Sequence, residues 1–426
     1  MKREVTIIGG GASGLTAAIT AAENEADVTV LEHMPRVGKK ILSTGNGKCN
    51  LTNLALSASC YRCSEPDFPM AVIGQFPVSE TLGFFRRLGV VTVDRNGYVY
   101  PMSGQAQTVL DALREKAESL GIHTVLECAP EAVIKRKDGF EIRTDKGSFH
   151  AGAVILAAGS AAAGSTGSDG SGYALAKALG HRIKKPLPAL VQLKCRGDYF
   201  KGIAGVRTEA KVSLYTAEKN GNLGKFLASD TGELQLTDYG ISGIPVFQVS
   251  RFASEALDRR KRVLAVIDFF PGFTAEELFA LLREQKKYLA DRELSSYLNG
   301  IFHKKLSALF LKAAGLKADR PAASLTEKQM SELAGLIKEW TAEVTEPNSF
   351  DKAQVCMGGV LTAEVDRLTM ESKLVPGLFF AGEILDVDGI CGGYNLQWAW
   401  SSGYLAGKSA AGCENRQHEN KERNYI

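Results

Sequence analysis

The run EVTIIGGGASG at residues 4–14 decides the fold. Residues 4–8 are β-prone, three glycines follow at once, and an alanine-rich helical pattern extends from about Ala12 to Asn24. A second β-prone run, DVTVL at 27–31, ends at Glu32. A strand, a helix and a second strand within the first 32 residues predict a βαβ unit and a parallel sheet.

The glycine spacing in this run is typical of a dinucleotide-binding turn. Gly9 permits the tight turn, Gly11 lets the backbone approach a pyrophosphate, and Gly14 lets the helix pack closely on the sheet. The start of the helix offers free N–H groups to phosphates. Glu32 is placed to accept both ribose hydroxyls, and it would repel a 2′-phosphate, which argues against NADP at this site. The predicted contacts from this unit are Gly9, Gly11, Ala12, Ser13, Gly14 and Glu32.

Composition excludes several classes of protein. The 426 residues are 45% hydrophobic and 23% charged, close to an average globular protein and unlike disordered, collagenous or disulfide-rich chains. A net charge of +3 is too small to suggest a nucleic-acid partner. No stretch approaches the ~18 apolar residues of a membrane span, and the N-terminal apolar run is too short for a signal peptide. We therefore expect a cytoplasmic protein with a small-molecule substrate.

The pattern changes along the chain. Short alternating runs separated by glycine turns at 190–270 predict an antiparallel sheet or small barrel, and charged helical periodicity follows from Thr274 to about Glu343. Glycines and short apolar runs return from 353, so the two ends are expected to form one split domain. The predicted fold is α/β, with a split Rossmann-like domain (1–190 and 351–426), a β-barrel-like domain (191–272 and 336–350) and a small helical domain (273–335). The helical domain is expected to have its own core, with Phe279, Phe302, Leu309 and Phe310, and the alternative is that these side chains line a hydrophobic substrate entrance.

Four further blocks carry a resemblance to a known family. They are PRVGKKILSTGNGKCNLTN (35–53), VILAAG with GSTGSDGSGY (154–159, 164–173), GEL with YGISG (232–234, 239–243), and AQVCMGGV with GEILD and GICGGYNLQWA (353–360, 382–386, 389–399). In this order, over almost the whole chain, they resemble the BaiN/YhiN-like family of bacterial FAD-binding flavoproteins. Two departures are Ile244 before Pro245, where the family often has proline after the Ser-Gly step, and Lys48 in place of arginine.

The resemblance implies that the split domain binds FAD. The glycine-broken loop at 44–50 suits an anion or the edge of the isoalloxazine, and a helix beginning at Tyr394 would face the electron-rich side of a reduced flavin. Glu383 and Asp386 are candidates for ribityl hydroxyls, although the 389–404 segment also fits a plain core helix. The further predicted FAD contacts are His33, Lys39, Lys40, Thr44, Gly45, Asn46, Lys48, Cys49, Asn50, Ala132, Val133, Ala157, Ala158, Gly159, Gly382, Glu383, Asp388, Gly393, Tyr394, Asn395 and Leu396.

Several reactions fit such a flavoprotein. Residues 190–350 contain no second glycine fingerprint, so NAD(P)H would bind only transiently over the flavin. The resemblance implies an NAD(P)H-linked reduction of an enone C=C bond in a bile-acid-like steroid. An aminoacetone-type amine oxidase and a redox sensor with little turnover are the alternatives.

The candidate catalytic residues are Tyr394 and Tyr239, which would protonate an enolate or steer a substrate, and Cys49, which is expected near the flavin ring. Cys60 and Cys63 form a C-x-x-C pair without the second pair that a metal site needs, and the histidines show no ligand spacing, so no metal is expected.

Overall fold

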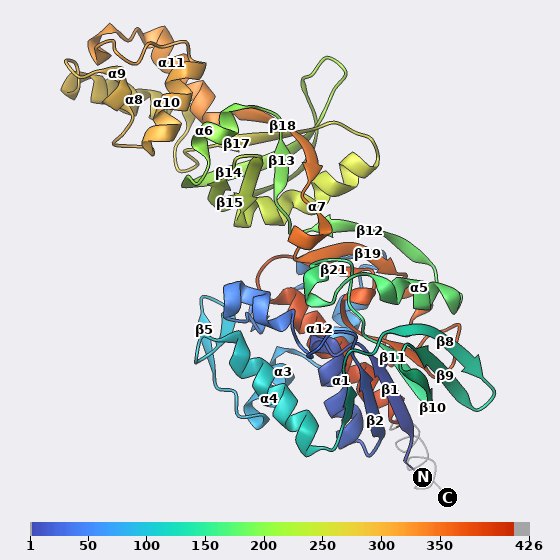
Figure 1. Cartoon of the computed structure of the whole chain (residues 1–426). Coiled ribbons are helices and arrows are strands. Elements are labelled where there is room, and N and C mark those ends of the chain that lie inside the picture. The colour runs from blue at the N-terminus through green and yellow to red at the C-terminus, as the bar shows by residue number, and fades with distance from the viewer. Residues whose placement is uncertain (1, 413–426) are drawn as a thin grey trace, which may run out of the picture. The chain divides into compact units, whose positions relative to one another are not determined.

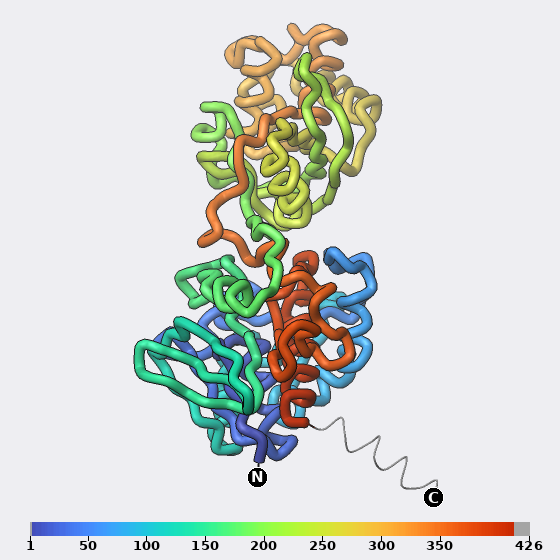
Figure 2. The backbone as a smooth tube through the Cα atoms, turned by 90° about the vertical axis from the view of Figure 1, so that its right-hand side faces the viewer, coloured from blue at the N-terminus to red at the C-terminus, as the bar shows by residue number. Residues whose placement is uncertain are grey.

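The central sheet is assembled from both ends of the chain. The computed structural model describes residues 2–412, in which five parallel strands lie in the order β20-β11-β1-β2-β7 (Figure 1). These strands are β1 (Glu4–Ile8), β2 (Asp27–Leu31), β7 (His123–Val125), β11 (Ala153–Leu156) and β20 (Leu378–Phe380). Figure 2 shows blue N-terminal and red C-terminal segments within one unit. The predicted split Rossmann-like arrangement is confirmed.

Helices cover this sheet, and two of them meet at glycines. A Cβ atom placed on Gly403 of α12 would lie 2.4 Å from the carbonyl oxygen of Ser13 in α1, and one on Gly407 would lie 2.3 Å from that of Ala17. The absence of side chains therefore lets the two helices pack backbone to backbone. The helices of this unit are α1 (Ala12–Glu23), α2 (Phe68–Ile73), α3 (Val78–Arg87), α4 (Ala106–Ser119), α5 (Ser171–Ala178) and α12 (Tyr394–Ala410).

Four small sheets complete the first unit. One has the order β3-β6-β5, another is antiparallel in the order β10-β9-β8, and two are strand pairs, β4 with β21 and β12 with β19. Their strands are β3 (Thr52–Asn53), β4 (Tyr61–Cys63), β5 (Thr92–Arg95), β6 (Tyr98–Pro101), β8 (Pro130–Arg136), β9 (Gly139–Thr144), β10 (Gly147–Ala151), β12 (Ile183–Ala189), β19 (Val355–Val360) and β21 (Val387–Gly389).

The second unit contains a closed six-stranded barrel in the order β13-β16-β15-β14-β17-β18. The unit spans Pro188–Ala353, and the first unit comprises Met1–Leu187 with Gln354–Ile426, of which 413–426 lie outside the described residues. The barrel strands are β13 (Leu193–Cys195), β14 (Arg207–Ala217), β15 (Leu223–Leu236), β16 (Gly240–Gly243), β17 (Val263–Asp268) and β18 (Trp340–Pro347). The predicted β-barrel-like insertion is therefore present.

Two features of this region were not predicted from the sequence. The runs at 190–270 predicted an antiparallel sheet or small barrel, and α7 (Ile244–Asp258) lies among these strands, because its buried Val246, Val249 and Ala253 recur at helical spacing. The helical segment also lacks a core of its own. Phe310 packs against Phe269 next to the barrel at 5.3 Å between ring centroids, so barrel and helices share one apolar core. The helices are α6 (Tyr199–Ile203), α8 (Ala275–Tyr288), α9 (Leu294–Tyr297), α10 (Lys304–Ala313) and α11 (Glu327–Lys338).

Candidate functional site

The turn between β1 and α1 contains two glycines that are needed for packing within the protein and one that is not. A Cβ atom on Gly9 would lie 2.5 Å from the carbonyl oxygen of Ala157, and one on Gly14 would lie 1.9 Å from that of Gly9. A Cβ atom on Gly11 would meet no heavy atom within 4 Å among residues 2–412, its chain neighbours aside. Gly11 therefore leaves space beside the backbone at the start of α1, where a phosphate fits.

Glu32 ends β2 and is fixed against this turn. Its Oε2 accepts a hydrogen bond of 2.8 Å from the Gly10 N–H, and its Oε1 accepts one of 2.8 Å from the Met34 N–H. These two bonds orient the carboxylate of Glu32, a residue that is only 9% exposed. Each carboxylate oxygen can accept more than one hydrogen bond, so both remain able to bind a hydroxyl.

His33 lies between two carboxylates at the same place. Its Nε2 is 3.9 Å from Glu32 Oε1 and its Nδ1 is 3.8 Å from Asp169 Oδ2, distances too long for hydrogen bonds. Nε2 is buried and has no hydrogen-bond partner in the described part of the chain. Buried polar atoms are almost always satisfied, so this nitrogen suits a ligand hydroxyl beside Glu32.

The loop at 41–50 is held by backbone in the left-handed region. Gly45, Asn46 and Cys49 have φ values of 55°, 56° and 58°. Asn46 and Lys48 are exposed, whereas Cys49 is fully buried. Burial raises the pKa of the Cys49 thiol to about 12. The thiol is therefore protonated at neutral pH, which is unfavourable for a nucleophile.

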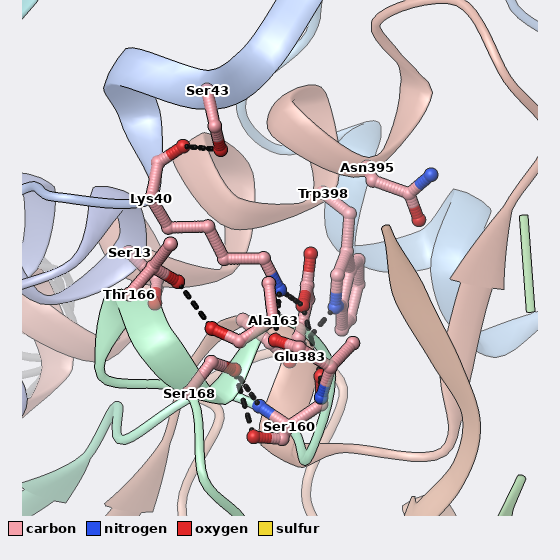
Figure 3. A network of polar contacts seen from close by, with 12 residues as sticks. Ser13, Lys40, Ser43, Ser160, Ala163, Thr166, Ser168, Glu383, Asn395 and Trp398 are labelled. Carbon is pink, nitrogen blue, oxygen red and sulfur yellow. Dashed lines mark hydrogen bonds and ion pairs between the residues drawn. The ribbon is translucent and has the colours of Figure 1, made fainter. Parts of the chain in front are cut away.

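Lys40 and Glu383 join distant parts of the sequence in an ion pair (Figure 3). Lys40 Nζ lies 2.7 Å from Glu383 Oε2 and donates to the Ala162 carbonyl at 3.2 Å. Ser160 Oγ donates to the same Glu383 oxygen at 3.1 Å. Ser160 follows β11 and Glu383 follows β20, so the network lies at the carboxyl ends of parallel strands. Open α/β sheets bind their ligands at this edge.

The start of α12 has no side-chain cap, and neighbouring residues fix the position of the turn before it. Gly393, with φ of +95°, has no room for a Cβ atom, which would lie 2.7 Å from the Thr52 carbonyl oxygen. Asn395 holds the preceding turn, because its Oδ1 accepts from the Gly389 N–H at 2.7 Å and its Nδ2 donates to the Gly389 carbonyl at 3.0 Å. Asn395 is thus a positioning residue for this turn.

Tyr394 is buried, and its hydroxyl already has a partner. The hydroxyl donates to the Ala55 carbonyl at 3.3 Å, and burial raises the pKa of Tyr394 to about 12. Tyr239, the other candidate acid, belongs to the second unit, where it is 37% exposed just before β16. Cys60 and Cys63 are free thiols on or beside β4.

The remaining predicted contacts lie on several elements. Ala132 and Val133 lie on β8, Asp388 lies on β21 and Leu396 lies on α12. The carbonyl oxygen of Asn50's side chain is buried without a partner in the described residues. Ser13, Asn50, Val133, Ala157, Gly382 and Asp388 are buried, Gly45 is exposed, and Ala12, Lys39, Thr44, Ala132, Ala158, Gly159 and Leu396 are half-buried.

Some residues that hydrogen-bond to the candidate site residues were not predicted from the sequence. Trp398 Nε1 donates to the Gly382 carbonyl at 3.0 Å, and Ser160 shares Glu383 with Lys40. Ser160 directly follows the Gly159 that ends the apolar strand, so its position was the available signal. Tyr98 and Tyr100 were also missed, although the Asn96-Gly97 pair between β-prone runs is a hairpin signal.

A dinucleotide fits the residues present. Gly11 leaves space at a helix start, an unpartnered His33 nitrogen lies beside Glu32, and neither α1 nor α12 has a side-chain cap. Among residues 2–412, no group of three or more His, Cys, Asp or Glu side chains is arranged to hold a metal. No helix in that part of the chain is long and apolar enough to cross a membrane.

Comparisons with known proteins agree with this arrangement. A 3-dehydro-bile acid delta(4,6)-reductase of Clostridium scindens is 46% identical over 409 residues, covering 96% of this chain and 98% of the relative. A ribosomal RNA dihydrouridine synthase of Haemophilus influenzae is 27% identical over 415 residues, covering 95% and 98%. The 3-ketosteroid delta1-dehydrogenase of Sterolibacterium denitrificans shares the fold, with a TM-score of 0.51 and 11% identity over 97% of this chain and 100% of that structure.

The family is shown by a match along nearly the whole chain. The model of the HI0933-like protein Rossmann domain matches residues 3–409. One relative is named for modifying ribosomal RNA, so the absence of a nucleic-acid partner stays a prediction for this chain. The resemblance to BaiN/YhiN-like flavoproteins is confirmed, and the chain belongs to the HI0933-like family as a flavin-dependent oxidoreductase.

Proposed function

We propose that this protein binds FAD in its first unit and uses it to reduce a C=C bond conjugated to a ketone in a steroid-like substrate, with NAD(P)H as electron donor. The observation that carries the proposal is the open space at Gly11 within a turn otherwise closed by backbone. It is supported by the 46% identity to a bile-acid reductase over 96% of the chain.

The residues of the site divide the binding of FAD among them. The start of α1 would hold the pyrophosphate, and Glu32 with His33 would hold the adenosine ribose. Lys40 and Glu383 offer a cation and a carboxylate at the carboxyl ends of the strands. The uncapped start of α12 would stabilise negative charge on a reduced flavin. FAD, when bound, supplies the hydride for the reduction.

The two kinds of relative suggest a common chemistry. The bile-acid relative is named for reducing C=C bonds of a steroid, and the other is named for converting uridine to dihydrouridine in ribosomal RNA. In both substrates the reduced C=C bond is conjugated to a carbonyl group. The higher identity favours the steroid for this chain, and uridine in RNA is the second candidate.

An anaerobic stopped-flow experiment tests the proposal. FAD-loaded protein is mixed with NADH or NADPH, and the flavin absorbance is followed. We expect bleaching, then recovery on addition of a 3-oxo-4,6-diene steroid, with a product that has gained two hydrogens. Recovery with a uridine oligoribonucleotide instead would move the function to RNA. Bleaching by aminoacetone with peroxide on re-aeration would indicate an amine oxidase, and no bleaching by any donor would indicate a redox sensor.

A pair of glycine variants tests FAD binding itself. Gly11→Val fills the open space at the start of α1, so FAD affinity should fall at least about 100-fold, a loss of roughly 2.8 kcal/mol. Gly272→Val is the matched control, because a Cβ atom there also meets nothing within 4 Å among the described residues, but it lies in the second unit. Equal FAD affinity in Gly11→Val and wild type would contradict the proposed site.

A further inference from the structure

The hairpin formed by β5 and β6 presents two phenols on one face. Side chains alternate along a strand, so Tyr98 and Tyr100 lie on one side of β6 and Val99 on the other. Val99 is 2% exposed and belongs to the buried face, whereas Tyr98 is 41% exposed. The turn between the strands is Asn96-Gly97, with φ values of 55° and 88°. Two left-handed residues are what a tight two-residue hairpin requires, so the direction of this face is well defined.

This face lies against both glycine loops of the candidate site. A Cβ atom on Gly392 would lie 2.8 Å from Cε1 of Tyr98, so the Tyr98 ring rests on the turn before α12. A Cβ atom on Gly45 would lie 3.5 Å from Cε1 of Tyr100, which is ordinary contact with the 41–50 loop. Asn53, the partner of Tyr98 on β3, donates to the Gly392 carbonyl at 3.0 Å. The hairpin therefore packs against the 41–50 loop and the turn before α12, which are expected to surround the flavin ring.

Other phenols nearby are committed to the protein backbone. The Tyr61 hydroxyl donates to the Tyr394 carbonyl at 2.9 Å, and the Tyr394 hydroxyl donates to the Ala55 carbonyl. Tyr98, by contrast, is an exposed residue. Burial raises the pKa of Tyr100, although the Arg95 guanidinium, 5.8 Å above its ring, acts in the opposite direction. Tyr100 is therefore a neutral O–H donor at physiological pH.

We propose that Tyr98 and Tyr100 are catalytic residues whose hydroxyl groups donate hydrogen bonds to the ketone oxygen of the substrate. This inference rests on the proposed function, because it needs a substrate with a carbonyl conjugated to the reduced bond. It replaces Tyr394 and Tyr239 as the phenols that touch the substrate.

The chemistry explains why a phenol is useful at this place. When a hydride adds to the β-carbon of an enone, the C=C bond is reduced and an electron pair moves to the ketone oxygen, which becomes an enolate oxygen. An O–H donor hydrogen-bonds the ketone and holds the enolate more strongly as its charge develops. A proton from solvent then adds to the α-carbon, which restores the ketone and completes the gain of two hydrogens.

The contact between the tyrosines and the ketone oxygen can be measured by comparing the binding of two ligands to wild type and to the tyrosine variants. The probes are a saturated 3-oxo steroid and the same steroid without the 3-oxo group, neither of which can be reduced at a conjugated bond. Their binding to the FAD-loaded protein is followed by the change in flavin absorbance. Wild type should bind the ketone about tenfold more tightly than the deoxy compound, as expected for one or two good hydrogen bonds. Tyr98→Phe and Tyr100→Phe should each remove about threefold of this preference, and the double variant should remove nearly all of it.

The same variants are then tested in the reduction. Each substitution should lower kcat/KM for the enone about tenfold or more, because the contact strengthens in the transition state. FAD affinity should stay unchanged, and Tyr288→Phe, on an exposed helix of the second unit, is the control. A double variant that keeps the wild-type ketone preference would overturn the role of these tyrosines. If wild type itself neither binds the ketone nor reduces the enone, the proposed function fails, and this inference falls with it.

Discussion

The two units of this protein share one use of glycine, and the first unit adds a second use within a tight turn. In the barrel unit, a Cβ atom on Gly240 or Gly243 would meet the backbone of a neighbouring strand at 2.3 or 2.2 Å, so these glycines only allow β16 to pack. In the first unit, Gly9 and Gly14 serve the same packing purpose, but Gly11 between them faces open space. A tight glycine therefore indicates packing, whereas an open glycine inside a tight turn indicates a ligand.

The largest expected effect on stability comes from adding a side chain at a tight glycine of the turn between β1 and α1. In Gly14→Ala the new methyl group would lie 1.9 Å from the Gly9 oxygen, and Gly9 cannot yield because it already lies against Ala157. We expect the free energy of unfolding to fall by at least about 4 kcal/mol. Urea unfolding in a Trp340→Phe background measures this, because the remaining tryptophans, Trp398 and Trp400, lie in the first unit.

The control for this prediction is the neighbouring open glycine. Gly11→Ala places a methyl group where no heavy atom of the described chain lies within 4 Å, at a φ of −80° that any residue adopts. Its stability should stay within about 0.5 kcal/mol of wild type. If Gly14→Ala and Gly11→Ala were equally stable, the distinction between tight and open glycines would be wrong.

A second large effect tests the single core of the barrel unit. Phe310 is fully buried and lies 5.3 Å from Phe269, 5.3 Å from Phe302 and 6.0 Å from Trp340 between ring centroids. Phe310→Ala should cost about 3–5 kcal/mol. Because barrel and helices share the core, hydrogen exchange should accelerate in both together, while peptides of the first unit stay protected.

A neighbouring phenylalanine gives the comparison for that variant. Phe279 is only partly buried at the edge of the same core, so Phe279→Ala should cost clearly less. Faster exchange confined to α8–α11 in Phe310→Ala would indicate that the helical segment is an independent domain, as its sequence alone suggested.

These differences also mark what the sequence can predict. The β1–α1–β2 turn and Glu32 were predictable because every residue involved lies within one local pattern. The Lys40–Glu383 ion pair joins residues 343 apart, and it exists only because β2, which precedes Lys40, and β20, which precedes Glu383, belong to the same sheet. Helix α7 was missed because neighbouring strand patterns dominated its surroundings, and the orientation of Tyr98 depends on contact with Gly392. Features set by a short stretch of sequence, such as the glycine turn, could be predicted, whereas contacts between residues that only the tertiary fold brings together could not.

Acid should destabilise the first unit. His181 is buried, its Nδ1 lies 3.1 Å from Glu364 Oε2, and its Nε2 lies 2.8 Å from Ser372 Oγ. Burial lowers the pKa of His181, although Glu364 opposes this shift. The unfolded chain therefore binds more protons, so this contribution to stability is complete above the ordinary pKa of about 6.5 and is lost as the pH falls through the lower folded value.

Urea midpoints measured from pH 8 to pH 5 in the Trp340→Phe background test this expectation. The midpoint should fall with decreasing pH, and His181→Gln should reduce the slope, since it removes the titrating group. His303 is exposed in the second unit, so His303→Gln should leave the slope unchanged. A wild-type slope retained in His181→Gln would show that other groups carry the acid sensitivity.

The smallest effect is expected where a side chain had been a catalytic candidate. Cys49 is fully buried, its thiol has a pKa raised to about 12 by burial, and it lies in a loop whose shape is set by left-handed backbone. A protonated, inaccessible thiol cannot attack a substrate, so only its volume matters. Cys49→Ala should keep kcat within about twofold of wild type and lower stability by about 1 kcal/mol, as for a small buried deletion. A thiol reagent at pH 8 should leave Cys49 unmodified in the native protein. A tenfold loss of kcat with unchanged FAD affinity would contradict this expectation. It would mean that the Cys49 side chain takes part in the reaction, and that the backbone geometry of the loop does not by itself explain why a cysteine lies there.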